Sequence, residues 1–172
     1  MLFWKNNIYT TKNILVFALF AVLLSVSFWR LPYSPATWYD EGINAGIAKS
    51  LIQDNVFSLK VAPGEFVETR QFLITTNYPV LLPVALSLKF FGVNFTAARL
   101  PSVVYLFLFA LLAYIATRKW YGDNAALATL ALIVFFLPFY GNGKSVLGEV
   151  AGLFFLLTGL LFLENNNLKK IF

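Results

Sequence analysis

Residues 99–119 read RLPSVVYLFLFALLAYIATRK. An uncharged run from Leu100 to Thr117 lies there between Arg99 and the basic pair Arg118 and Lys119. At 1.5 Å per residue, a helix over this run is about 27 Å long, close to the ~30 Å hydrocarbon core of a bilayer. The stretch therefore predicts a membrane-spanning helix.

The composition of the whole chain also indicates a membrane environment. Of the 172 residues, 59% are hydrophobic and 12% charged, whereas soluble domains carry about 25% charged residues. The net charge of +5 comes from basic residues beside hydrophobic runs, which suits membrane orientation and argues against a nucleic-acid partner. Cysteine and histidine are absent, which excludes disulfides, thiol nucleophiles and histidine acid–base chemistry. A divalent cation held by carboxylates remains possible.

Three further apolar runs accompany the first one, and together they predict four spans at 13–31, 100–117, 124–140 and 145–163. A signal peptide is the rival interpretation of the first run, but that run ends in Trp29 and Arg30 without a small-residue cleavage site. Pro138 predicts a kink in the third span. The last run, Val150 to Leu163, covers only about 21 Å, so its helix is expected to start near Ser145.

A long loop over 32–98 separates the first two spans and contains two expected surface helices, at 40–54 and 78–91. In the first of them Ile43, Ile47 and Leu51 recur every four residues, which predicts an amphipathic helix resting on the membrane surface. The second has Pro79 in its first turn and is too short to cross, which favours an interfacial or re-entrant helix. The expected fold is an all-α integral membrane domain.

The basic residues orient the four predicted spans. With the N-terminus in the cytoplasm, six of them flank spans on the cytoplasmic side: Lys5, Lys12, Arg118, Lys119, Lys169 and Lys170. The long loop is then extracytoplasmic, and the chain is expected to be a multi-pass protein of the cell membrane.

Two acidic features fall on the extracytoplasmic side. Asp40 and Glu41 follow the first span, and either cap a helix, with Thr37 and Asp40 forming a capping box, or supply a carboxylate general base. Glu149 is either an outer-end helix residue or an ionisable group facing a wet cavity. The basic residues Arg99 and Lys144 are either boundary anchors or phosphate contacts.

The segment Tyr39-Asp40-Glu41-Gly42-Ile43-Asn44-Ala45, followed by Ala98-Arg99-Leu100-Pro101-Ser102 before the second span, resembles glycosyltransferase family 39. This family includes the dolichyl-phosphate-mannose protein mannosyltransferases and the aminoarabinose transferase of lipid A. The resemblance implies a GT-C fold and transfer of a sugar from a polyprenyl-phosphate carrier to a protein, lipid or glycan acceptor. It covers the chain from Trp4 to Leu163.

Carried over by position, the resemblance implies a role for each site residue. Asp40 is the expected base, Glu41 would orient the acceptor or support Asp40, and Glu149 is the second acid, where family members often have Asp. The expected substrate-binding residues are Arg99 and Lys144 for the carrier phosphate, with Tyr39 and Asn44 beside them.

Members of this family have about twice as many helices, so the chain is expected to be the N-terminal part of a longer enzyme. Two other function classes stay open. One is a non-catalytic membrane scaffold or assembly protein. The other is a lipid-carrier transporter that uses Glu149 as an intramembrane charge, although no internal repeat supports it.

Overall fold

The computed structural model describes residues 2–67 and 76–165, with side chains for 11–67 and 76–164. These residues form seven helices and one antiparallel two-stranded sheet, so the expected helical fold class is confirmed apart from a small hairpin. In chain order the elements are α1 Leu2–Phe28, α2 Tyr39–Gln53, β1 Lys60–Ala62, β2 Glu65–Phe66, α3 Tyr78–Phe91, α4 Phe95–Tyr121, α5 Asp123–Phe135, α6 Leu137–Gly143 and α7 Glu149–Asn165.

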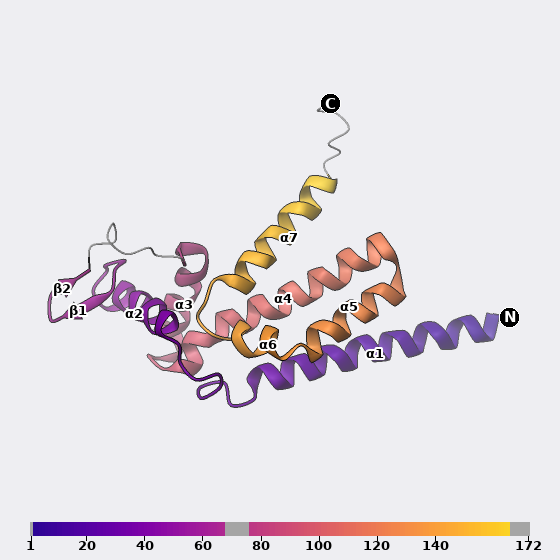
Figure 1. Cartoon of the computed structure of the whole chain (residues 1–172), viewed down its shortest axis with the longest axis horizontal. Helices are drawn as coiled ribbons and strands as arrows, with labels where there is room; N and C mark the ends of the chain where they lie inside the picture. Colours follow the sequence, from indigo (N-terminus) through magenta and orange to yellow (C-terminus); the bar gives the residue numbers. More distant parts are fainter. Residues whose placement is uncertain (1, 68–75, 166–172) are drawn as a thin grey trace, which may run out of the picture.

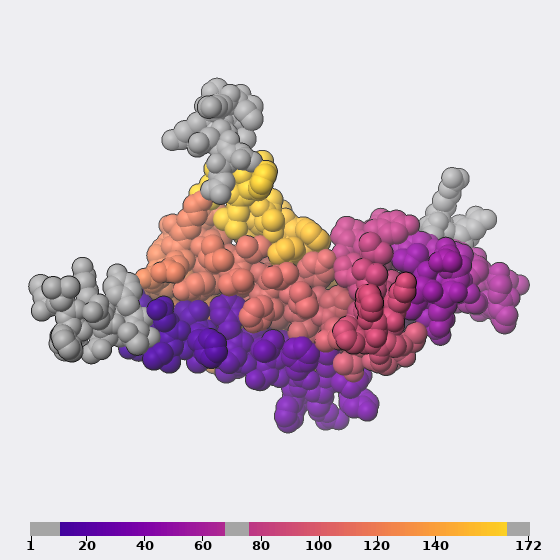
Figure 2. All heavy atoms as spheres, turned by 180° about the vertical axis from the view of Figure 1, so that it is seen from behind, coloured from indigo at the N-terminus to yellow at the C-terminus, as the bar shows by residue number. Residues whose placement is uncertain are grey.

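The helices are arranged in two groups (Figure 1). Helices α1, α4 and α5 lie side by side, and α2, α3 and the hairpin gather at one end of them. Figure 2 shows the same division from behind, with α1 along one side of α4 and α5. Lys169 and Lys170, which entered the charge argument, lie outside the described residues.

Two of the predicted spans are confirmed as helices long and apolar enough to cross a membrane. They are the segment Thr11–Phe28 of α1 and the whole of α4. Helix α4 extends beyond both ends of the predicted span because Asn94 caps its start, accepting a hydrogen bond from the Ala97 N–H at 2.8 Å, and Gly122 with φ 86° ends it.

The third predicted span is a bent pair. Helices α5 and α6 meet at Phe136 at an angle of 61°. The pair is long and apolar enough to cross a membrane only when both helices are counted as one bent span. Pro138, the predicted kink, sits in the first turn of α6, where its missing N–H breaks no helical hydrogen bond. The described part of the chain thus has two or three candidate spans, fewer than the four predicted.

Helix α7 begins at Glu149, so the predicted start near Ser145 is wrong. Both backbone groups of Val146 are bonded to side chains of α2, and this holds the preceding stretch outside the helix. The 17 residues of α7 cover about 25 Å, short of a ~30 Å core. The helix is therefore not among the candidate spans of the described residues.

The start of α2 also differs from the expected capping box. The residue before the helix is Trp38, in an extended conformation, and no side chain caps it, so the role predicted for Thr37 is wrong. The first turn nevertheless carries Asp40 and Glu41, whose negative charge is favourable at the positive end of a helix.

The apolar stripe of α2 packs against other helices of the protein. Ile47 and Ala48 are buried in a core cluster with Leu81, Val84 and Leu88 of α3, and Ile43 and Leu51 pack against the same cluster. The stripe from which contact with the membrane surface was predicted is thus covered by α3, which supplies an apolar partner for that face.

Helix α3 has the predicted bounds. Asn77 accepts a hydrogen bond from the Tyr78 N–H at 2.8 Å, Pro79 lies in the first turn, and Gly92 with φ 84° ends the helix. Two side-chain bonds attach α3 to α4. Ser87 donates to the Ala97 carbonyl at 2.6 Å, and Tyr105 donates its hydroxyl to the Pro79 carbonyl at 2.7 Å.

At the C-terminal end of α4, polar and charged side chains connect this helix to α7. Trp120 donates to Glu164 of α7 at 2.9 Å, and Lys119 pairs with the same carboxylate at 3.1 Å. Arg99 and Arg118 of α4 are 19 residues apart, about 28 Å along the helix. Along the helix, Arg118 and Lys119 therefore lie about the thickness of a hydrocarbon core away from Arg99.

Candidate functional site

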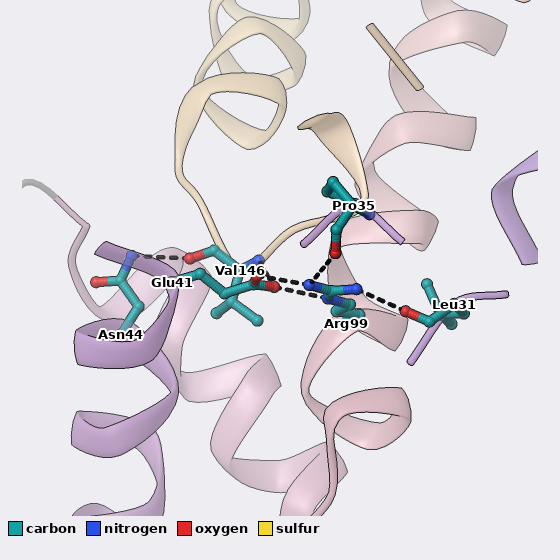
Figure 3. A network of polar contacts seen from close by, with 6 residues as sticks. All are labelled: Leu31, Pro35, Glu41, Asn44, Arg99 and Val146. Atoms are coloured by element: carbon teal, nitrogen blue, oxygen red, sulfur yellow. Dashed lines mark hydrogen bonds and ion pairs between the residues drawn. The ribbon is translucent and has the colours of Figure 1, made fainter. Parts of the chain in front are cut away.

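The candidate site centres on an ion pair between α2 and the start of α4 (Figure 3). Arg99 donates from Nε to Glu41 Oε1 at 2.7 Å and from Nη2 to Glu41 Oε2 at 2.6 Å. Both residues are 0% exposed. A two-point contact of this kind uses the planar fork of arginine, and burial makes each charge depend on the other.

The remaining donors of Arg99 hold the chain that follows α1. Nη1 donates to the Leu31 carbonyl at 2.7 Å, and Nη2 donates to the Pro35 carbonyl at 3.1 Å. In Figure 3 the guanidinium lies between Glu41 on one side and these two carbonyls on the other. Arg99 thus joins the start of α4 to two other segments, and each of its three nitrogens is engaged by the protein.

The same carboxylate binds the link before α7. Glu41 Oε1 accepts the Val146 N–H at 3.0 Å, and Asn44, one turn further along α2, donates to the Val146 carbonyl at 2.8 Å. Asn44 also donates to Thr76 Oγ1 at 3.2 Å. Side chains one turn apart on α2 therefore fix both backbone groups of Val146, and with them the link that leads to Glu149.

Lys144 belongs to this link and is 3% exposed. Its Nζ donates to the Trp29 carbonyl at 3.0 Å, and no carboxylate pairs with it among the residues that the structure describes. Burial lowers the pKa of Lys144, and the nearby charge of Arg99 lowers it further. Lys144 thus holds the end of α1 against the α6–α7 link.

Asp40 and Glu41 are neighbours in sequence but have opposite environments. Successive residues of a helix point about 100° apart, so the turn that buries Glu41 leaves Asp40 exposed. Within the described part of the chain, the side chain of Asp40 makes no hydrogen bond or ion pair. Tyr39 is 73% exposed. These two residues lie at the surface, outside the buried network.

Glu149 occupies a third environment. It is exposed at the first position of α7 and lines a cleft of about 630 Å³. The walls of this cleft are mostly apolar and aromatic, and they come from the 35–38 link, α6 and α7. They include Pro35, Trp38, Phe136, Pro138, Phe139, Val150 and Leu153. One of these lining residues, Trp38, precedes Asp40 by two positions in the sequence.

The structure thus divides the seven predicted site residues. Glu41, Asn44 and Arg99 belong to one buried network, and Lys144 is buried separately on the Trp29 carbonyl. Glu149 lines the cleft, and Asp40 and Tyr39 are exposed at the start of α2. The backbone partners at Trp29, Leu31, Pro35 and Val146 were not predicted, because a carbonyl or N–H carries no side-chain signature. The cleft walls were missed as well, although Trp38 adjoins the acidic motif.

No group of three or more acidic side chains that could hold a metal ion gathers within 2–67 and 76–165. Comparison with known proteins gave no match to a family model, a curated protein or a solved structure. The fold alone defines the class at this point. Over residues 2–67 and 76–165 the chain is mostly helical with two or three candidate membrane spans, the arrangement of a multi-pass membrane protein.

Proposed function

We propose that this chain is the membrane-embedded part of a glycosyltransferase, which moves a sugar from a polyprenyl-phosphate carrier to an acceptor hydroxyl at the extracytoplasmic membrane face. The observation that carries the proposal is that Asp40 and Glu149 both lie exposed in the first turns of their helices, α2 and α7. Glu41 and Val146 tie these two helix starts together with a 3.0 Å hydrogen bond.

In this proposal Asp40 acts as the general base for the acceptor hydroxyl. Its carboxylate is exposed in the first turn of α2, where an acceptor hydroxyl can reach it. The buried ion pair next to it anchors the turn, so that Asp40 is presented without rotation of α2. Glu41 then supports Asp40 through the backbone and does not touch the acceptor.

The cleft is the proposed site of the carrier. Aromatic and aliphatic walls suit an isoprenoid chain, and Glu149 lies among them as a polar group for the sugar. Arg99 and Lys144 are buried with their donors used by carbonyls and by Glu41, which favours a structural role over the phosphate contact first expected. Arg30, exposed in the link that Arg99 binds, is the proposed phosphate contact.

One observation favours the scaffold alternative. The two most buried charged groups, Glu41 and Arg99, satisfy each other and bind four separate segments, as a purely structural joint would. A scaffold of this kind needs no base, and therefore makes no demand on Asp40.

Sugar transfer from radiolabelled polyprenyl-phosphate sugars distinguishes the two functions. Membranes carrying the protein are supplied with protein, lipid and glycan acceptors, and Asp40→Asn is compared with Asp40→Glu and with Lys49→Gln on the same helix. The transferase proposal expects turnover to fall at least 100-fold in Asp40→Asn, to recover partly in Asp40→Glu and to persist in Lys49→Gln. Equal turnover in Asp40→Asn and the parent removes Asp40 as the base.

A further inference from the structure

Helix α3 carries an apolar face that no described element covers. Leu82, Leu86 and Phe90 recur every four residues and are 45%, 46% and 76% exposed. The opposite face packs into the core cluster with α2 and the start of α4. The helix is thus apolar on both sides, a pattern that soluble surface helices do not show.

The position of α3 relative to α4 sets its depth. Counting about 20 residues, or ~30 Å, back from Arg118 places the outer hydrocarbon boundary near Ala98. Ser87, near the end of α3, bonds to the carbonyl of Ala97 at this boundary. Tyr105, which holds Pro79 at the start of α3, lies about 10 Å further along α4. The start of α3 is therefore attached to a deeper level than its end.

The charges around α3 fit this tilt. Its one charged residue, Lys89, lies in the last turn, at the level of the headgroups. Lys49 of α2 stands beside Leu88, Val93 and Phe95 at a cavity of about 240 Å³, near the same boundary. A lysine there can keep its ammonium in water while its stem follows apolar surface.

We infer that α3 is a lipid-contacting helix that enters the bilayer obliquely, with the face Leu82, Leu86 and Phe90 against acyl chains and its start deeper than its end. Helix α2, whose stripe is covered by α3, then takes no part in lipid contact. At 14 residues, about 21 Å, α3 is too short to cross the bilayer, so it dips into one leaflet only. This inference stands independently of the proposed enzymatic activity.

The absence of cysteine makes the test direct, because single-cysteine variants carry no background. Leu82→Cys, Leu86→Cys and Phe90→Cys are spin-labelled in the whole chain in phosphatidylcholine–phosphatidylglycerol liposomes. Collision rates with oxygen, which concentrates in lipid, are compared with those for a water-soluble nickel chelate. Phe17→Cys, 78% exposed on α1, is the lipid control, and Glu65→Cys on the exposed hairpin is the aqueous control.

All three labels are expected to resemble the α1 control in their preference for oxygen, with depth increasing from Phe90 through Leu86 to Leu82. Accessibility to nickel like that of Glu65→Cys would place the face in water and overturn the inference. Low collision rates with both reagents would show a protein partner on this face and overturn it equally. Equal depth at the three positions would contradict the oblique entry. If one variant loses the parent's helical circular dichroism, the comparison with the two controls and the order of depth are taken from the other two positions.

Discussion

The carboxylate of Glu41 and the guanidinium of Arg99 form an ion pair through two hydrogen bonds, Nε to Oε1 at 2.7 Å and Nη2 to Oε2 at 2.6 Å. Both residues are completely buried. The partners are 58 residues apart in the chain and belong to α2 and α4. Because Glu41 also binds Val146 and Arg99 also binds Leu31 and Pro35, this pair joins the segments after α1 and before α7 to the two helices.

Removing one partner of this pair is expected to be costly. Glu41→Ala leaves Arg99 charged and unpaired in the interior, which should reduce the free energy of unfolding by about 3–5 kcal/mol. The double variant Glu41→Met, Arg99→Met should lose less than the two single changes combined, because no uncompensated charge remains. Denaturant titration in detergent micelles measures both. Simple additivity of the two single changes would contradict the coupling.

The amide of Asn44 predicts a smaller effect. Asn44→Ala leaves the Val146 carbonyl and Thr76 without their donor and should cost about 1–3 kcal/mol. Lys49→Ala, on the exposed side of the same helix, is the matched control and should stay within about 0.5 kcal/mol of the parent. Thermal unfolding followed by circular dichroism compares the two. An Asn44→Ala variant as stable as Lys49→Ala would remove Asn44 from the network.

Lys144 predicts a pH dependence of stability. In the fold its pKa lies below the ordinary 10.5, because burial and the charge of Arg99 disfavour the ammonium. The unfolded chain then binds the proton more tightly, so stability rises as the pH increases from the folded pKa toward 10.5. Comparing Lys144→Met with the parent isolates this contribution from those of other lysines and tyrosines.

In that comparison the stability of the parent relative to Lys144→Met should grow over the alkaline range just below pH 10.5. The measurement is the midpoint of thermal unfolding in micelles across a buffer series. Lys49→Met, at an exposed position, should show no such divergence. A parent that loses stability relative to Lys144→Met over the same range would reverse the sign and refute the prediction.

The cleft predicts a separation of binding from stability. Leu153→Trp adds bulk to a wall of the 630 Å³ cleft at a position that is 41% exposed, so folding should change by less than about 1 kcal/mol. Under the proposed function the KM for the lipid-linked donor should rise about tenfold, because the filled cleft excludes the carrier chain. Leu156→Trp, exposed on α7 and outside the cleft lining, is the control. Equal KM values in the two variants would separate the cleft from donor binding.

The sequence by itself determined the elements whose signals are local. Charge-free runs predicted the helices of α1 and α4, and Pro79 predicted the start of α3, because its backbone restriction acts within one turn. Glu41, Asn44, Arg99 and Lys144 were all singled out as chemistry-bearing residues. Their assignment to substrate came from the motif, and contained no information on their neighbours.

Only the tertiary structure decided what those residues touch. Glu41 and Arg99 satisfy each other because α2 folds onto the start of α4, and the stripe of α2 is covered because α3 folds onto it. Helix α7 starts at Glu149 because Val146 is bonded to α2. Each outcome depends on contacts between segments far apart in the chain, often with backbone groups common to every residue. A pattern read along one segment cannot encode them.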